Sequence, residues 1–208
     1  MNKKENSLRV GFHSIESILS NNPHKIKKVT LPANRNDQRI SSLILALEKN
    51  SIKYDLSSKL KQEPEAIIVN ENELNFKDLK NFLSLEVTKP LILILDNIID
   101  PRNLGACIRS AAVIGVDALI INKHHCAPIN SVAHKVSAGG AEVIKIFHVT
   151  NLINCLKFLK ESNVNIYGLS EHAQESHLEC NFTSPSAIIM GAEESGIRKK
   201  TLEICDFK

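Results

Sequence analysis

The sequence predicts an α/β protein in which a small N-terminal α/β domain precedes a domain built on a mostly parallel sheet. In the second half of the chain, short apolar runs of strand length alternate regularly with stretches of helical spacing. The dipeptide Lys89-Pro90 ends a polar stretch before this pattern, and Pro90 cannot continue a helix. A length of 208 residues accommodates two modest domains. We therefore place the domains at residues 1–88 and 89–208.

Apolar spacing predicts the elements of both domains. The expected elements are, in chain order, a helix around residues 15–19, a strand at 28–31, a helix at 38–48, a strand at 66–69, a short helix around 79–83, then strands at 91–95, 118–121, 143–147, 166–169 and 187–190 and helices at 104–114, 152–161 and 197–204. The regular alternation in the second half predicts helices on both faces of the sheet. Ligands of such sheets bind beyond the carboxyl ends of the strands, so the residues after each strand are the candidates for a site.

Composition excludes several classes of protein. The chain is 43% hydrophobic and 24% charged, and no apolar run approaches the roughly 20 residues that cross a bilayer. Its first residues lack the pattern of a secretory signal or transit peptide, which favours a cytoplasmic location. The five cysteines are scattered without a C-x-x-C pair, which indicates reduced thiols. The consecutive residues 124–126, His-His-Cys, cannot all converge on one tetrahedral ion, so we expect no metal.

Positive charge is concentrated near the N-terminus. Residues 1–39 hold 8 Lys and Arg against 3 Asp and Glu, whereas residues 91–208 hold 11 against 12. A basic face of this kind attracts phosphate backbones, although a merely solvated face is the plain alternative. Aromatic residues make up only 4% of the chain and Trp is absent, so charge and shape rather than base stacking would hold a nucleic acid. The candidate phosphate-binding residues are Arg9, Lys25, Lys27, Lys28, Arg35 and Arg39.

The first motif follows the strand at 91–95 and runs from Asp100 to Arg109. Asp100 or Asn103 can cap the following helix and Pro101 can begin its first turn, which gives these residues a structural explanation. Capping does not explain Arg109, which follows the small residues Gly105 and Ala106. This arginine is either a surface residue, a member of a close-packed interface, or a cation that points into the cleft beside the strand ends.

The second motif follows the strand at 187–190. Gly191 permits close approach of the backbone to a ligand, Gly196 relaxes the turn, and Glu193 brings a carboxylate to the strand end. The fingerprint G-x-G-x-x-G and the phosphate loop G-x-x-x-x-G-K-[ST] are both absent from the sequence. Their absence argues against nicotinamide oxidoreductases and P-loop NTPases.

Taken together, the two motifs resemble those of the SpoU (TrmH-like) branch of the SPOUT methyltransferases. Asp100-Pro101-x-Asn103-x-Gly105-Ala106-x-x-Arg109 and Met190-Gly191-x-Glu193-x-x-Gly196 match, and Lys135-x-Ser137-x-Gly139-Gly140-Ala141-Glu142 resembles the segment between them. Residues 11–19 resemble the start of the RNA-binding domain of the 23S rRNA guanosine 2'-O-methyltransferases, the most similar subgroup. The resemblance covers nearly the whole chain.

The resemblance implies a trefoil-knot domain whose C-terminal segment threads through a loop to complete the cofactor pocket. The family's third motif would follow Cys205-Asp206, but the sequence ends at Lys208, so we expect the knot-closing segment to be absent. The resemblance also implies a homodimer with an isologous interface near the cofactor pocket.

The implied reaction is methyl transfer from S-adenosylmethionine to a ribose 2'-hydroxyl of 23S rRNA. The resemblance assigns catalysis to Arg109, Asn103 and Glu193, with Arg109 as base. Because guanidinium groups stay protonated, we assign Arg109 instead to clamping a phosphate and stabilising the alkoxide, while a phosphate oxygen or water takes the proton. The expected cofactor contacts are Leu169, Ser170, Gly191, Ala192 and Glu193. Two alternatives stay open, a catalytically silent RNA-binding or assembly protein and a tRNA 2'-O-methyltransferase.

Overall fold

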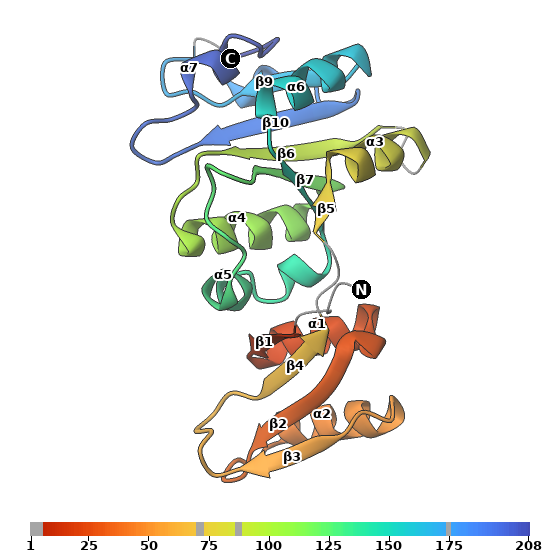
Figure 1. The fold of residues 1–208 in the computed structure, drawn as a ribbon. Helices are drawn as coiled ribbons and strands as arrows, with labels where there is room; N and C mark the ends of the chain where they lie inside the picture. Colours follow the sequence, from red (N-terminus) through yellow and green to blue (C-terminus); the bar gives the residue numbers. More distant parts are fainter. Residues whose placement is uncertain (1–5, 70–72, 86–88, 174–175) are drawn as a thin grey trace.

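The computed structural model of the chain describes residues 6–69, 73–85, 89–173 and 176–208, and these form two α/β units, each with its own sheet (Figure 1). The elements of the first unit are β1 (Asn6–Val10), α1 (Phe12–Asn21), β2 (Ile26–Pro32), α2 (Gln38–Lys49), β3 (Tyr54–Ser57) and β4 (Glu65–Val69). The elements of the second unit are β5 (Leu74–Asn75), α3 (Phe76–Leu85), β6 (Leu91–Asp96), α4 (Pro101–Ile114), β7 (Ala118–Asn122), α5 (Ser131–Val136), β8 (Lys145–Val149), α6 (Leu152–Glu161), β9 (Asn165–Gly168), β10 (Ser186–Gly191) and α7 (Lys199–Leu202). Short 3-10 turns lie at Pro23–Lys25, Gly140–Glu142 and His177–Glu179.

The first unit is a four-stranded sheet with strand order β1-β4-β2-β3, in which only the β2–β3 pairing is parallel. Its helices α1 and α2 supply buried side chains at helical spacing, such as Ile15 and Ile18 from α1 and Leu43 and Leu47 from α2. These side chains pack with those of β2 and β4 into one core. Asp37 caps α2, because its carboxylate accepts hydrogen bonds from the amides of Arg39 and Ile40.

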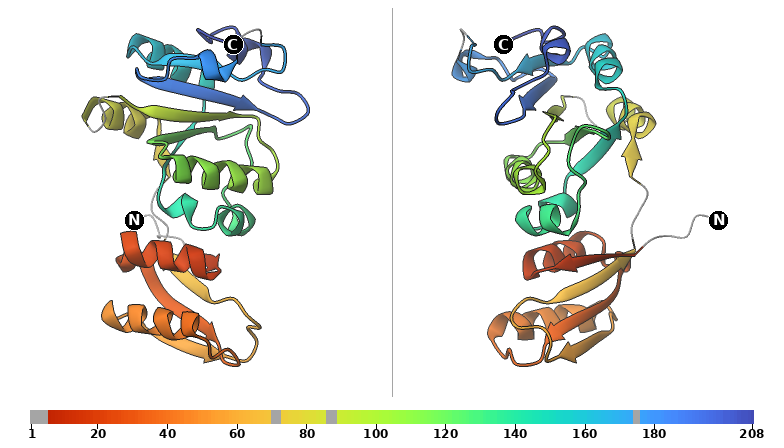
Figure 2. Two further views of the ribbon diagram at one scale, coloured as in Figure 1. Left: turned by 180° about the vertical axis from the view of Figure 1, so that it is seen from behind. Right: turned by 60° about the vertical axis from the view of Figure 1, so that its left-hand side comes forward.

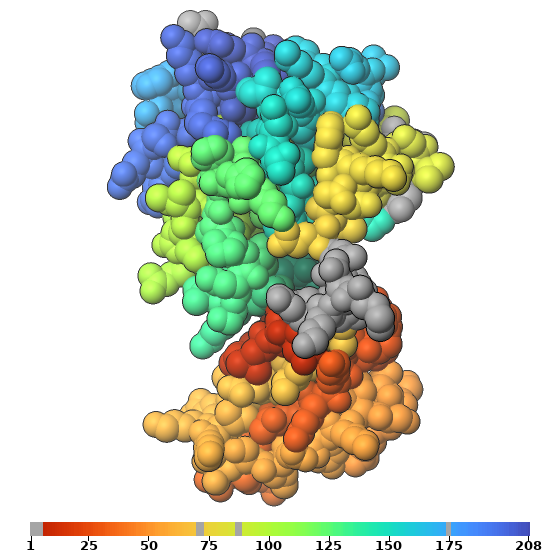
Figure 3. Space-filling view, viewed as in Figure 1, coloured from red at the N-terminus to blue at the C-terminus, as the bar shows by residue number. Residues whose placement is uncertain are grey.

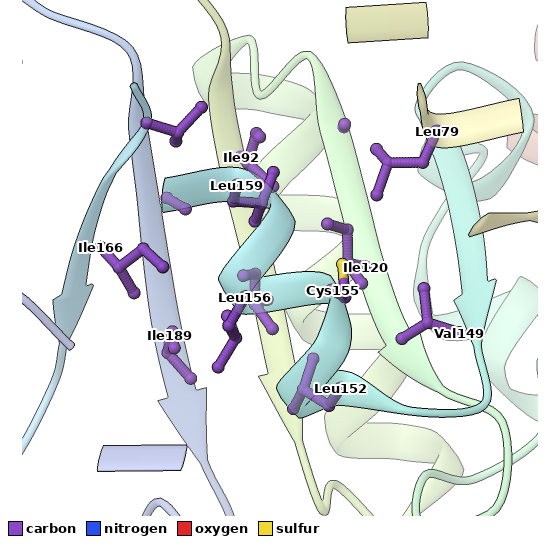
Figure 4. Packing of buried hydrophobic residues seen from close by; sticks show 14 of the residues in the cluster. Leu79, Ile92, Ile120, Val149, Leu152, Cys155, Leu156, Leu159, Ile166 and Ile189 are labelled. Atoms are coloured by element: carbon purple, nitrogen blue, oxygen red, sulfur yellow. The ribbon is translucent and has the colours of Figure 1, made fainter. Parts of the chain in front are cut away.

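The second unit is a six-stranded sheet with order β5-β8-β7-β6-β10-β9, and every pairing in it is parallel. The alternating residues of β6 enter different cores: Ile92 and Ile94 pack with α3 and α6, whereas Leu93 and Leu95 pack with α4. Figure 4 shows the first of these cores, with α6 lying across the strands. The expected mostly parallel sheet with helices on both faces is therefore confirmed.

The two sheets divide the chain earlier than the predicted boundary at residue 88. Residues 86–88 lie outside the described part of the chain, but β5 pairs with β8, and Leu79 and Phe82 of α3 lie in the core of the second unit. The polar stretch before Pro90 was therefore wrongly assigned to the N-terminal domain. The division falls between β4 and β5, so residues 74–85 belong to the second unit.

Three further predictions of element bounds are corrected by the structure. The strand expected at 143–147 occupies 145–149, since residues 140–142 form a 3-10 turn, and the helix expected at 197–204 is limited to Lys199–Leu202. Strands β1, β3 and β5 and helix α5 were not predicted. The helix α4 begins earlier than expected, at Pro101, because Asp100 is its N-cap, and it ends at Gly115, which adopts φ +77°.

The two units contact one another through α1 and β1 on one side and α5 and the 140–142 turn on the other (Figure 2). Ser17 of α1 donates a hydrogen bond to the carbonyl of Gly139, 3.2 Å away. A Cβ at Gly139 would lie 2.9 Å from the carbonyl oxygen of His13, so the residue must be glycine for α1 to approach this closely. The surfaces of the two units meet along this contact in the space-filling view (Figure 3).

Candidate active site

The first motif forms the turn between β6 and α4. Asp100 caps the helix, since its Oδ1 accepts a hydrogen bond of 2.7 Å from the amide of Arg102, and Pro101 occupies the first turn. Asn103 is thereby not the cap, and its amide side chain is exposed at the carboxyl edge of the sheet. Gly105 lies at a close crossing of helices, because a Cβ there would lie 2.7 Å from the carbonyl oxygen of Ala133 in α5.

The second motif forms a tight turn after β10. The amide of Ala192 donates to the carbonyl of Gly196 at 3.1 Å, and the amide of Gly196 donates back at 2.8 Å. A Cβ at Gly191 would lie 2.0 Å from the carbonyl carbon of Gly196. Glycine at position 191 is thus required by the turn itself. The turn presents Glu193 to the first motif.

The two motifs meet through one hydrogen bond. Asn103 Nδ2 donates to Glu193 Oε2 at 3.2 Å, although 90 positions separate the two residues in the sequence. Both lie on a cleft of about 260 Å³ beyond the ends of β6 and β10, which pair as neighbours in the sheet. The cleft is lined by Asn97, Ile98, Ile99, Asp100, Asn103, Ala192, Glu193, Glu194 and Ser195. The predicted pair of motifs therefore forms one site at the carboxyl edge of the sheet.

Arg109 lies further along α4 than this cleft. It lies six positions after Asn103, which is about 9 Å along the helix axis and about 120° around it. Its guanidinium is exposed and forms no hydrogen bond or ion pair with any residue that the structure describes. The 140–142 turn packs against its backbone, since a Cβ at Gly140 would lie 3.2 Å from Arg109 Cα. The structure thus brings Asn103 and Glu193 together but leaves Arg109 apart from both, available to an anion.

Four of the five residues predicted to bind the cofactor divide between two clefts, and Gly191 lines neither of them. Leu169 and Ser170 follow β9 and line a cleft of about 380 Å³, whereas Ala192 and Glu193 line the cleft that Asn103 shares. Strands β9 and β10 are paired neighbours, and the amide of Leu169 donates to the carbonyl of Ile189. Aromatic rings form one wall of the larger cleft, where Tyr167 stacks on Phe207 with centroids 4.7 Å apart.

One feature of this edge was not predicted from the sequence. Asp96 ends β6 with no exposed surface, and its Oδ1 accepts a hydrogen bond from Nε of Arg198, with which it forms an ion pair. The second oxygen of Asp96 accepts a hydrogen bond from the backbone amide of Arg198 at 3.2 Å. An aspartate that ends an apolar strand, together with the later run Arg198-Lys199-Lys200, was the available signal. Helix caps and overall charge were the features considered in the sequence, and neither of these indicates that Asp96 pairs with Arg198.

The predicted RNA-binding cations of the first unit differ in their surroundings. Arg35 pairs with Asp37, Lys28 pairs with Asp55, and Arg39 donates to Glu16 at 3.0 Å. Arg35 and Arg39 also lie over the ring of Phe12, 4.6 and 4.5 Å from its centroid. Lys27 is exposed and Lys25 partly exposed.

Arg9 is an exception, because it lies in the contact between the two units. It is 8% exposed, and its Nε donates to Glu142 Oε1 at 2.7 Å, while His134 Nδ1 lies 3.0 Å from the same oxygen. An arginine that is buried against a carboxylate cannot reach an RNA phosphate, so the prediction that Arg9 binds RNA is corrected. Burial raises the pKa of the Glu142 carboxyl, but His134 and Arg9 lower it by more, so the pKa lies below its usual value.

The remaining chemistry-bearing groups do not form a further centre. In the described ranges, no three His, Cys, Asp or Glu side chains are placed to hold a metal ion. No described helix has the length and apolar character needed to span a bilayer. Burial raises the pKa of Cys155 to about 12, so this thiol stays protonated and is no nucleophile.

A parallel α/β sheet with two motif loops joined at its carboxyl edge defines a protein that binds its ligands at that edge. Comparison with protein families matches residues 90–208 to the SpoU rRNA Methylase family and residues 10–63 to the RNA 2'-O ribose methyltransferase substrate-binding family. The chain belongs to the SpoU rRNA methylase family.

Named relatives resemble the chain over almost its full length. It is 34% identical over 94% of its residues to the 23S rRNA (guanosine-2'-O-)-methyltransferase RlmB of Photorhabdus laumondii, and covers 84% of that protein. It is 33% identical to the RlmB of Escherichia coli, with the same coverage.

Solved structures share its fold. The SpoU methyltransferase AviRb of Streptomyces viridochromogenes, in complex with AdoMet, superposes with a TM-score of 0.74 at 18% identity, over 96% of this chain and 78% of that one. An RNA 2'-O ribose methyltransferase superposes with a TM-score of 0.75 at 19% identity, over 98% of this chain and 78% of that one.

Proposed function

We propose that the chain transfers a methyl group from S-adenosylmethionine to the 2'-hydroxyl of a guanosine in 23S rRNA. The observation that carries the proposal is the hydrogen bond between Asn103 and Glu193, which unites the two motifs at the carboxyl edge of the sheet. Relatives that are 33 to 34% identical and carry this activity in their names support the same substrate.

The ends of β9 and β10 suit the proposed cofactor in size and chemistry. A cleft of about 380 Å³ lies within the usual range for small-molecule sites, and it combines an aromatic wall with polar groups such as Ser170. We assign cofactor contacts to Leu169, Ser170, Gly191, Ala192 and Glu193. When bound, S-adenosylmethionine supplies a methyl group that is already activated for transfer.

The protein groups then have to align and activate a weakly acidic hydroxyl. The hydrogen bond between Asn103 and Glu193 fixes the positions of both side chains at the cleft. The two polar groups can then orient the ribose. Arg109 stays protonated, binds a phosphate beside the target nucleotide and stabilises the developing alkoxide, while a phosphate oxygen or water accepts the proton. Its lack of a partner among the described residues leaves its donors available for this role.

The first unit supplies the additional affinity for RNA. Lys25, Lys27, Lys28, Arg35 and Arg39 form its proposed phosphate-binding face, from which Arg9 is removed. Because the proposed substrate is ribosomal RNA, we place the protein in the cytoplasm.

We also propose a homodimer. Its support is an apolar groove of about 350 Å³ between α4 and strands β6 and β10, next to the exposed side chains of Val113 and Ile114. Burial of apolar surface of this kind drives association of subunits. Light scattering at micromolar concentration should give twice the mass of the chain; the mass of a monomer would contradict this part.

The test is transfer of labelled methyl groups from S-adenosylmethionine to protein-free 23S rRNA, followed by mapping of the 2'-O-methyl position as resistance to alkaline cleavage. We expect one guanosine to be labelled, and Asn103→Ala and Glu193→Gln each to lower the rate strongly. Transfer to tRNA instead would favour the tRNA enzyme. RNA binding without any transfer would favour the silent RNA-binding protein.

A further inference from the structure

A third cleft on the carboxyl edge of the sheet lies beyond the ends of β7 and β8. It has a volume of about 340 Å³ and lies apart from the residues of both motifs. Its lining residues are Asn122, His125, Thr150, Asn151, Leu152, Ile153, Arg198, Lys199, Lys200 and Thr201. Three of them are cationic, one is a histidine, and none is an aspartate or glutamate.

Of the three cations of this cleft, the two lysines have no acidic partner among the residues that the structure describes. Lys199 and Lys200 are exposed and form no ion pair with any residue that the structure describes. Two like charges at adjacent positions repel one another, so their placement at one cleft favours an anionic ligand. The first turn of α6 also borders the cleft, and the positive end of its dipole adds a contribution of the same sign.

Arg198 is held in place for such a ligand. Its Nε donates to Oδ1 of the fully buried Asp96 at 2.8 Å, and Nη2 lies 2.7 Å from the same oxygen as part of the ion pair. Its backbone amide donates to the other oxygen. The guanidinium side chain is nonetheless 36% exposed. A guanidinium has five donors, so donors remain available while one edge is fixed. Asp96 therefore acts as a positioning residue for Arg198.

The position of the cleft relates it to the motif site. Asp96 ends β6, and its neighbour Asn97 lines the cleft of Asn103 and Glu193, while its partner Arg198 lines the basic cleft. In the sheet, β8 and β7 lie directly beside β6 and β10. With neighbouring strands about 4.8 Å apart, the two clefts are roughly 10 Å apart, a spacing of one to two nucleotides along an RNA backbone.

We propose that the cleft formed by Arg198, Lys199, Lys200 and His125 binds a backbone phosphate of the RNA, one or two nucleotides from the modified ribose. The inference rests on the proposed function, because it names where the substrate of that site is held. The contact is to phosphate and carries no base specificity, so it fixes the register of the strand across the carboxyl edge.

The experiment compares two double variants of the full chain. Lys199→Gln with Lys200→Gln removes both lysines of the cleft, whereas Lys49→Gln with Lys77→Gln removes the same charge from exposed positions on α2 and α3. All four side chains are exposed, so both proteins should fold, which thermal melting would verify. The probe is a hairpin from 23S rRNA, and its binding is measured from about 50 to 200 mM salt.

We expect the cleft variant to raise the Kd for RNA about tenfold and to reduce the slope of log K against log salt by about 1 to 2, while the control variant behaves as the unchanged protein. At saturating RNA, kcat should be preserved and only KM raised. An equal Kd and salt slope for the cleft variant and the control would overturn the proposal. Tight binding of pyrophosphate alone, with RNA affinity unchanged in the cleft variant, would also overturn it, since the cleft would then serve a small phosphate.

The binding measurement separates this inference from the proposed function. Because it uses no cofactor and detects no reaction, a protein that transfers no methyl group can still lose RNA affinity through the cleft variant. That result would support the proposed phosphate site and contradict the proposed methyltransferase activity. Methyl transfer that proceeds with an unchanged KM in the cleft variant would instead overturn the phosphate site and leave the methyltransferase activity standing.

Discussion

Two arginines, Arg9 and Arg109, show how differently the same side chain is used in the two regions of this molecule. Arg9 is buried between the units and is held by Glu142, which also lies 3.0 Å from His134. Arg109 is exposed on α4 and has no partner among the described residues. A buried cation requires a fixed partner, whereas a cation that binds a ligand must keep its donors available. Burial and the presence of a partner, more than residue type, therefore separate the arginine that joins the units from the arginine that is available to a ligand.

The two regions are nevertheless in contact. The 137–142 segment faces α1 of the first unit through Gly139 and faces α4 through Gly140, which packs beside Arg109 Cα. The docking contact thus supports the backbone that carries the proposed catalytic cation. Substitution of Arg109 should mainly change the rate of methyl transfer. Substitution of Arg9 should mainly change the association of the two units.

The largest effect is expected for Arg109→Ala. Loss of the phosphate clamp and of alkoxide stabilisation should lower the rate of methyl transfer by about 10² to 10³ or more. Because the side chain is exposed and unpartnered among the described residues, the melting temperature should stay unchanged. Single-turnover transfer to 23S rRNA measures the rate, and calorimetric titration with S-adenosylmethionine should give an unchanged Kd.

Loss of cofactor binding together with activity would show that Arg109 is structural. A matched control is Arg102→Ala, which removes another exposed arginine from the same helix. Its amide, which donates to Asp100, is retained in the variant.

The next largest effect is expected for Arg9→Met, which leaves Glu142 buried without its arginine partner. Removing one member of a buried ion pair costs about 3 kcal/mol of stability. The apolar stem of Met replaces part of the lost packing, so the cost comes mainly from the carboxylate. Urea unfolding measures it, and small-angle scattering should show a larger radius of gyration if the units separate.

The double variant Arg9→Met with Glu142→Gln tests the cause of this loss. Removing both charges should restore part of the stability, because no buried charge is then left unpaired. If the double variant is as unstable as the sum of the single variants, the ion pair does not account for the contact. The rate of methyl transfer at saturating RNA would then show whether the position of Arg109 on α4 depends on the contact between the units.

The sequence predicted what depends on local patterns and missed what depends on contacts between distant residues. The strand at Leu91–Asp96 and the helix at Pro101–Ile114 were predictable from an apolar run and from Asp100, Pro101 and Gly115. The short strand Leu74–Asn75 was missed because its only support is pairing with β8. The meeting of Asn103 with Glu193 could be inferred only through a family resemblance. The burial of Arg9 follows from docking of the units and left no local pattern.

A smaller effect is expected for Gly139→Ala, measured against Gly115→Ala. Both glycines adopt positive φ, +91° and +77°, so each substitution introduces similar backbone strain. At Gly139 the new Cβ would also lie 2.9 Å from the carbonyl oxygen of His13, whereas at Gly115 no atom lies within 4 Å. We expect a loss of about 2 kcal/mol for Gly139→Ala and about 1 kcal/mol for Gly115→Ala in urea unfolding. Equal losses would mean that α1 moves away at no cost.

The smallest effect is the pH dependence that Glu142 gives to docking. Burial raises the pKa of this carboxyl, and His134 and Arg9 lower it by more, so the folded pKa lies below the ordinary value of 4.5. A depressed pKa contributes stability that is fully present above the unfolded pKa and is lost as pH falls through the folded one. The radius of gyration should therefore be constant above the unfolded pKa and increase only as the pH falls below it towards the folded pKa. Glu142→Gln should remove this component, because an amide does not titrate, and an identical acid profile in the variant would assign the transition to other carboxylates.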